Sequence, residues 1–199
     1  MLFRSGFLRA RYRGLFAGIQ ERLFAFVAAG GWPPATILRQ SQVFDQHVAP
    51  YLERKVRTAY FLVDSLRFEM GRDLAAALQG LGEVECHAAA CVMPTTTEFG
   101  MAALLPKVEG LLSVVDKDGE TLAAVGRRLL RTSQDRLAYL RESYGDRTAD
   151  TTLDDLLSRG KRYLARFKNT DLLVVRTQDP DQIGELLGGV RARRYLSDV

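Results

Sequence analysis

The sequence predicts an α/β fold with a mainly parallel sheet flanked by helices, preceded by a helical N-terminal segment. Almost wholly apolar runs at 58–63 and 171–175 resemble strands of a parallel sheet, which are buried on both faces. Several segments between and around them show apolar residues at three- and four-residue steps, which is typical of helices. This alternation along one chain favours a parallel α/β sheet over an all-helical or all-strand fold.

Residues 1–34 form the first predicted unit, a basic amphipathic helical segment with a linker. Apolar residues recur at helical spacing over 1–29, and the GGWPP run at 30–34 ends the helix. Residues 1–22 contain five arginines and one acid, Glu21, which accounts for the net charge of +4. Arginines can bind nucleic-acid phosphates, but the interspersed apolar residues suit a helix docked on protein. We favour protein docking.

The second predicted unit, 35–199, begins with a helix and continues with alternating elements. We expect a helix at 35–52, a basic turn at 53–57, the strand at 58–63 and a helix at 67–81 that ends at glycines. A second strand at 84–92 would complete a βαβ unit. Three threonines then open a helix at 98–105, which Pro106 stops.

The sequence from residue 107 onwards predicts further helices around a third strand. Residues 107–119 suggest a loop or short hairpin around Asp118-Gly119, with 111–115 as a possible strand. The ranges 121–144 and 153–167 look helical, 171–175 is the third apolar strand, and 183–196 resembles a helix.

Composition predicts a globular protein of a reducing compartment. The chain has 199 residues, 47% of them hydrophobic and 26% charged, as in ordinary globular domains. Its apolar stretches are far shorter than a membrane helix, and the first residues lack a signal peptide's apolar core. We expect a cytoplasmic protein with no membrane association. Cys86 and Cys91 lie five residues apart in one predicted strand, so we expect two small buried side chains without a disulfide.

Candidate functional residues follow the predicted strands. Ligands of open α/β sheets bind beyond the carboxyl ends of the strands, which here singles out Asp64, the segment 94–97 and the segment 177–181. Carboxylates and a hydroxyl at this edge can hold divalent cations and activate the hydroxyl. Zinc would suit a set that includes imidazole, and magnesium or manganese an all-oxygen set. By spacing alone, the threonines fit a helix N-cap better than a catalytic group.

Two ordered motifs, YFLVDSLRFEMGRDLAAAL and MPTTTEFGMAALLP, resemble the start of a PglZ domain. The segments VFDQHVAPYLERKVRTAYFLVD and, more loosely, LLVVRTQDPDQIGE extend the resemblance. PglZ domains belong to the alkaline phosphatase superfamily, so the resemblance implies an alkaline-phosphatase-like fold, here partial. It also implies phosphoesterase activity with two metal ions, usually zinc. We expect a phosphodiesterase of nucleotides or nucleic acid in a BREX phage-defence setting.

The resemblance also implies residue roles. Asp64 matches the first metal ligand, and Thr97 the nucleophile that also contacts a metal, with Thr96 and Thr95 as alternatives because the three threonines blur the register. The ligands implied for the other metal are Asp181 and Glu185, with Asp179 as an alternative.

Three further side chains are candidates for the site. Arg67 can contact a substrate phosphate or equally pair with Glu69 to position the loop. The two histidines, His47 and His87, fall away from the predicted strand ends and are expected to be structural or exposed.

The superfamily site also needs an Asp-His pair and a later histidine, and this sequence has neither. We therefore expect a fragment of a longer protein that binds at most one metal weakly and turns over little. The alternative is a non-catalytic interaction module, in which the PglZ-like core is a scaffold and residues 1–34 dock on partner subunits or DNA.

Overall fold

The computed structural model describes residues 2–182 and divides into two compact units, 1–37 and 38–199. The first unit contains one helix, α1 (Leu2–Gly30), in agreement with the predicted helical segment. Gly31 follows with φ 77°, a left-handed conformation that favours glycine. No helix of the described residues is long and apolar enough to cross a membrane.

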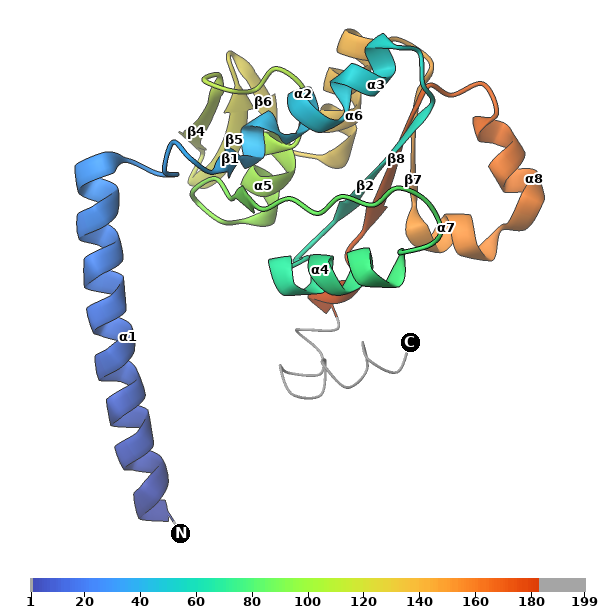
Figure 1. The fold of residues 1–199 in the computed structure, drawn as a ribbon. Helices are drawn as coiled ribbons and strands as arrows, with labels where there is room; N and C mark the ends of the chain where they lie inside the picture. The colour runs from blue at the N-terminus through green and yellow to red at the C-terminus, as the bar shows by residue number, and fades with distance from the viewer. Residues whose placement is uncertain (1, 183–199) are drawn as a thin grey trace. The chain divides into compact units, whose positions relative to one another are not determined.

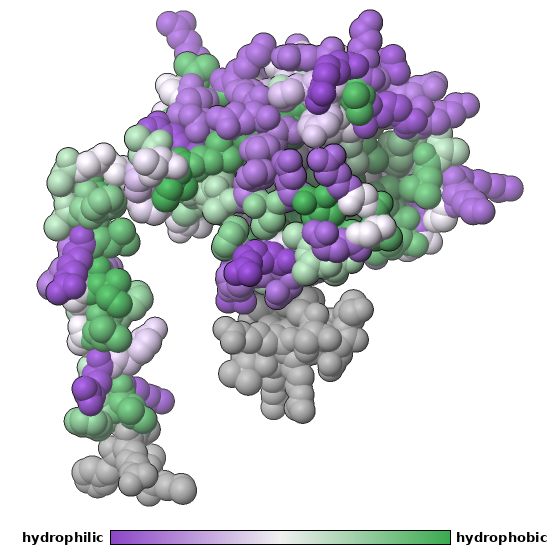
Figure 2. Space-filling model, in the orientation of Figure 1, coloured by the Kyte–Doolittle hydropathy of each residue, from purple (hydrophilic) through white to green (hydrophobic). Residues whose placement is uncertain are grey.

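Helix α1 carries a row of apolar side chains. Leu8, Tyr12, Leu15 and Ile19 are spaced by four, three and four residues, which places them on one face of a continuous helix. Figure 2 shows apolar groups running along this helix. A lone helix has no second element within its own unit to cover such a face.

The second unit is built on a parallel sheet, as predicted. Its strands, in the order β2-β8-β7, are β2 (Thr58–Val63), β8 (Leu172–Thr177) and β7 (Thr148–Thr152) (Figure 1). Val63 lies opposite Thr177, and Thr152 lies opposite Arg176. All three strands therefore end at one edge. The prediction missed β7, because its sequence TADTT is polar and lacks an apolar run.

Strand β2 was expected to be buried on both faces, and this was wrong. Among the described strands it pairs only with β8, so it is an edge strand. Leu62 is 8% exposed, whereas the adjacent Phe61 is 51% exposed. The two faces of β2 thus differ, as alternation along a strand requires.

The prediction of a single helix at 35–52 was also wrong. This segment forms β1 (Leu38–Arg39), a 3-10 turn η1 (Gln40–Gln42), α2 (Val43–His47) and α3 (Ala49–Glu53). Pro50 explains the break between the two helices, because it has no backbone N–H to donate to the carbonyl one turn earlier.

Helix α4 (Phe68–Ala77) confirms the predicted helix, although it ends earlier. The strand predicted at 84–92 is wrong, since only β3 (Ala89–Ala90) forms, and it pairs with β1 rather than with β2. The expected βαβ unit therefore does not exist within one sheet. Both cysteines are exposed rather than buried, and neither forms a disulfide. The short strand explains this exposure, because it leaves both cysteines outside any sheet.

A three-stranded antiparallel sheet occupies part of the chain that was predicted to be helical. It contains β4 (Leu112–Lys117), β5 (Glu120–Val125) and β6 (Arg128–Leu130). The hairpin at Asp118-Gly119 is confirmed, and both residues have the positive φ of a tight hairpin turn, 57° and 80°. The helix predicted at 121–144 begins only at α6 (Ser133–Tyr144), because the apolar residues before it pair as strands.

The helical segment predicted at 153–167 is confirmed as three short pieces, α7 (Leu153–Ser158), α8 (Gly160–Leu164) and η2 (Ala165–Phe167). Arg159 separates the first two, and α8 begins at Gly160, whose φ of 68° turns the chain there. The helix predicted at 183–196 lies outside the described residues.

Helix α5 (Thr97–Ala103) links the core to the edge where the parallel strands end. Phe99 on this helix is 2% exposed, and it belongs to the same buried cluster as Phe44 and Leu172. Phe44 packs edge-on against Tyr60 of β2, with ring centroids 5.5 Å apart. This packing holds α5 against the parallel sheet. The mixed α/β architecture is consistent with an alkaline-phosphatase-like fold.

Candidate active site

Asp64 occupies the first position after β2. Its backbone N–H donates to the carbonyl of Thr177 at 3.0 Å, which continues the strand ladder by one residue. Its side chain turns into the protein, so that the residue is only 7% exposed. A nearly buried carboxylate at the edge of the sheet is rare without a compensating partner.

Among the described residues, Thr97 forms a side-chain hydrogen bond with this carboxylate. Its Oγ1 lies 3.2 Å from Asp64 Oδ2 and 3.5 Å from Oδ1, so the hydroxyl donates to the carboxylate. Thr96 occupies the N-cap position of α5, but its side chain makes no capping hydrogen bond. Thr95 and Thr96 line the same cleft without contacting Asp64. The fold therefore selects Thr97 among the three threonines as the partner of Asp64.

Ser65 brings a second carboxylate to this cleft. Its φ of 58° is left-handed, an uncommon conformation for a residue with a side chain. In this conformation its Oγ donates to Asp181 Oδ1 at 2.6 Å. Asp64, the three threonines and Asp181 thus line one cleft of about 500 Å³. We name it the Asp64 cleft.

The other predicted residues lie elsewhere. Asp179 lines a neighbouring cleft, and its backbone N–H donates to Thr177 Oγ1 at 3.2 Å. Arg67 pairs with Glu69 at 3.1 Å, with both side chains more than half exposed. Glu185 lies outside the described residues.

The two histidines stack on each other, with ring centroids 5.1 Å apart. His87 also contacts Glu85 at 3.0 Å. Neither histidine lines the Asp64 cleft or the neighbouring cleft.

The donor atoms of the Asp64 cleft suit hard divalent cations. Asp64 and Asp181 offer carboxylate oxygens and Thr97 a hydroxyl, the ligand type that magnesium and manganese prefer. Within residues 2–182 no group of three or more His, Cys, Asp or Glu side chains is placed to hold a metal. Structural and catalytic zinc sites use three or four protein ligands. The described residues therefore fit part of one ion's ligand shell.

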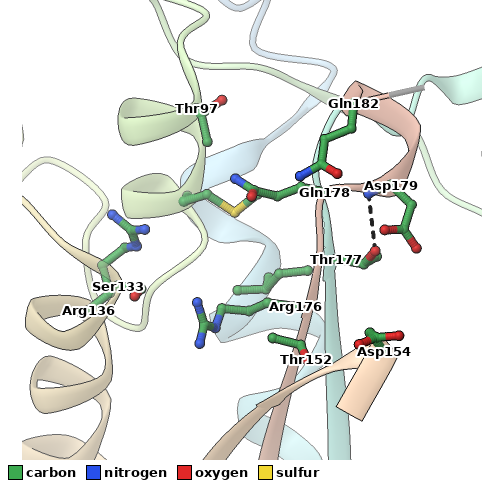
Figure 3. Close-up of a pocket in the computed structure, with 12 residues that line it drawn as sticks. Thr97, Ser133, Arg136, Thr152, Asp154, Arg176, Thr177, Gln178, Asp179 and Gln182 are labelled. Atoms are coloured by element: carbon green, nitrogen blue, oxygen red, sulfur yellow. Dashed lines mark hydrogen bonds between the residues drawn. The ribbon is translucent and has the colours of Figure 1, made fainter. Parts of the chain in front are cut away.

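A second cleft, of about 540 Å³, adjoins the first and shares Thr97 with it. We name it the Arg136 cleft, and Figure 3 shows the residues that line it. Ser133 and Arg136 come from α6, Thr152 ends β7, Asp154 lies in α7, and Arg176 lies in β8.

Sequence reasoning missed this cleft because it missed β7 and the true start of α6. One sequence signal was available for both. Thr132-x-x-Asp135 and Thr152-x-x-Asp155 are helix-start patterns, and in each the threonine accepts a hydrogen bond from the backbone N–H of the aspartate. They mark the beginnings of α6 and α7, the helices that carry the missed residues.

Comparison with known protein families identifies one match. A family model described as the BREX system PglZ alkaline phosphatase-like domain matches residues 43–185, well over half of the chain. The match covers the Asp64 cleft, the threonine run and the three strands of the parallel sheet. No curated protein matches the chain. The chain belongs to the family of BREX PglZ alkaline phosphatase-like domains.

Proposed function

We propose that this PglZ domain is a metal-dependent phosphoesterase that works in BREX defence, with Thr97 as nucleophile and Asp64 as metal ligand. The observation that carries the proposal is the contact of 3.2 Å between the Thr97 hydroxyl and a carboxylate that is 7% exposed. Membership of an alkaline phosphatase-like family supports it, because enzymes of this superfamily generally use divalent metals.

The chain's own residues would act in a simple sequence. Asp64 orients the Thr97 hydroxyl towards a bound phosphate ester. Thr97 Oγ1 forms a bond to phosphorus as the bond between phosphorus and the ester oxygen breaks. The proton of the hydroxyl passes to solvent, and the ester oxygen takes up a proton from solvent and leaves as an alcohol. Water then cleaves the threonine ester and releases phosphate or a phosphomonoester. A divalent cation would neutralise charge on the phosphoryl oxygens and lower the pKa of the attacking hydroxyl.

The substrate and the metal are finer parts of the same proposal. We propose a phosphodiester of a nucleotide or a nucleic acid, as the family resemblance implies. Zinc remains the expected metal by that resemblance, whereas the oxygen donors of Asp64, Thr97 and Asp181 favour magnesium or manganese. Parallel assays with Zn²⁺, Mg²⁺ and Mn²⁺ decide between them.

The test is hydrolysis of bis(4-nitrophenyl) phosphate by the full-length protein. Thr97→Ala should lower kcat by at least about 10³-fold, because it removes the nucleophile. Thr95→Ala and Thr96→Ala are matched controls that line the same cleft. We expect them to change kcat by less than about tenfold, since neither hydroxyl contacts Asp64. Full activity in Thr97→Ala would refute the assignment.

A second candidate function, docking onto partner subunits or DNA, rests on helix α1. Its apolar face has no cover within its own unit, and it is flanked by the basic residues Arg9, Arg11, Arg13 and Arg22. We propose protein partners as the main binding class. Deletion of residues 1–34 should abolish co-purification of other defence-system subunits while circular dichroism of the core persists. Unchanged co-purification would rule this function out.

A further inference from the structure

The Arg136 cleft has a cationic wall. Arg136 extends from α6 and Arg176 from β8, and Figure 3 shows both guanidinium groups on one side of the cleft. Arg176 Nη2 lies 2.7 Å from Asp150 Oδ2, and both side chains are about one third exposed or less. The charge of Arg176 is therefore compensated, and its position is fixed.

Arg136 differs from Arg176 because no carboxylate of the described residues lies within ion-pair distance of its guanidinium. The side chain is half-buried. Burial, and secondly the nearby charge of Arg176, lower the pKa of Arg136, although a guanidinium stays protonated in proteins. Asp150 pairs with Arg176, whereas the carboxylates of Glu98 and Asp135 act on Arg136 only from beyond ion-pair distance. A bound anion would supply hydrogen-bond acceptors directly at the Arg136 guanidinium.

The rest of the cleft determines where an anion would bind. The side chains of Asp154 and Asp179 lie across the cleft from the two guanidinium groups (Figure 3). Repulsion by these carboxylates directs an anion towards Arg136. Ser133 lines the cleft one turn before Arg136 on α6 and adds a hydroxyl to the same wall.

Thr97 connects this cationic wall to the proposed reaction. Thr97 lines both clefts. In the Asp64 cleft its hydroxyl donates to the carboxylate of Asp64, and in the other cleft it lines the same space as Arg136. A substrate whose scissile phosphate lies at Thr97 can therefore extend directly into the Arg136 cleft.

We propose that Arg136 binds a second phosphate group of the substrate, next to the phosphate at Thr97, and so selects substrates with two neighbouring phosphates over those with one. The planar guanidinium donates two parallel hydrogen bonds to phosphate oxygens. The position of the scissile phosphate rests on the proposed function, whereas phosphate binding by Arg136 does not.

The test uses two ligands that differ by one phosphate, thymidine 3′,5′-bisphosphate and thymidine 5′-monophosphate. Isothermal titration calorimetry of the whole chain in EDTA measures both dissociation constants without metal or turnover. We expect the bisphosphate to bind about tenfold more tightly, a ratio typical of one charge-assisted contact. Arg136→Gln should bring this ratio close to one. Arg136→Lys should leave an intermediate ratio, because lysine keeps the positive charge but cannot donate two parallel hydrogen bonds.

Arg131→Gln is the matched control, since Arg131 is exposed, lies just before α6 and does not line the cleft. It should keep the full ratio. A ratio near one in the unmodified chain, or an undiminished ratio in folded Arg136→Gln, overturns the inference. Thr97→Ala separates the two proposals, because it should abolish hydrolysis and leave the ratio intact. Bisphosphate selectivity without any metal-dependent hydrolysis would refute the proposed function and support the phosphate site.

Discussion

Replacement of Asp64 by Asn should stabilise the metal-free chain and remove its response to divalent metal. Asn has the same shape, so it keeps the hydrogen bond with Thr97 but removes the negative charge. In the fold, the Asp64 carboxylate is 7% exposed, and its described side-chain contact is a neutral hydroxyl at 3.2 Å. No cationic side chain of the described residues forms an ion pair with this carboxylate, and a buried charge without a partner destabilises a folded state.

The size of the effect follows from two opposing terms. Single stabilising substitutions commonly contribute about 0.5–2 kcal/mol, and we expect Asp64→Asn to fall in this range. For a unit of this size, that corresponds to a rise in Tm of about 1–8 °C. Metal reverses the order of stability, because it stabilises the native chain but not the variant. At about 100 times the dissociation constant, bound metal stabilises the native chain by about 2.7 kcal/mol. The variant should therefore be more stable in EDTA and less stable in saturating metal.

Differential scanning calorimetry in EDTA and in excess MnCl₂ measures both terms. Asp116→Asn is the matched control, because Asp116 is exposed on β4 and lines neither cleft. It should leave Tm and the metal response unchanged. The reasoning fails if Asp64→Asn has a lower Tm than the native chain in EDTA, or if its Tm rises with manganese as much as that of the native chain.

Three further predictions concern the framework of the site. Phe99→Ala should destabilise the chain by about 3–5 kcal/mol in urea unfolding, whereas Phe61→Ala should cost less than about 1.5 kcal/mol, because Phe99 is 2% and Phe61 51% exposed; equal losses would contradict this packing. Tyr60→Phe should cost about 1 kcal/mol in the same assay, because it removes the hydroxyl's hydrogen bond to the carbonyl at the end of α5; no change would show that the bond contributes nothing. Hydrogen bonds from Thr132 lower the pKa of Asp135, so its contribution is complete above the unfolded-state pKa of about 4 and is lost as pH falls through the folded-state pKa. Asp135→Asn should therefore flatten the loss of stability below about pH 4 in acid titrations followed by circular dichroism, and an unaltered acid profile would contradict the assignment.

The fold was predictable where local sequence decides structure. The strand at 58–63 and the hairpin at Asp118-Gly119 are confirmed, because an apolar run and a glycine-containing turn are local signals. The predictions failed where hydrogen bonding to a neighbouring strand decides whether a segment forms a strand. Residues 120–125 form β5 because neighbouring strands supply their hydrogen bonds, and TADTT forms β7 because β8 lies beside it.

The candidate site divides in the same way. Asp64 and the threonine run could be found from motifs close together in the sequence. Arg136 could not be found, because it lines a cleft with Thr97 only after segments far apart in the chain have folded together.

The sequence by itself determined the α/β class, the PglZ family and the residues at the ends of two strands, since these follow from short apolar runs and local motifs. Only the tertiary structure decided which threonine meets Asp64, since the three threonines have the same side chain and differ only in where the backbone at the start of α5 places it. It also decided that β2 is an edge strand among the described strands and that Arg136 shares a cleft with Thr97. These relations depend on contacts between distant segments, which residue order alone does not specify.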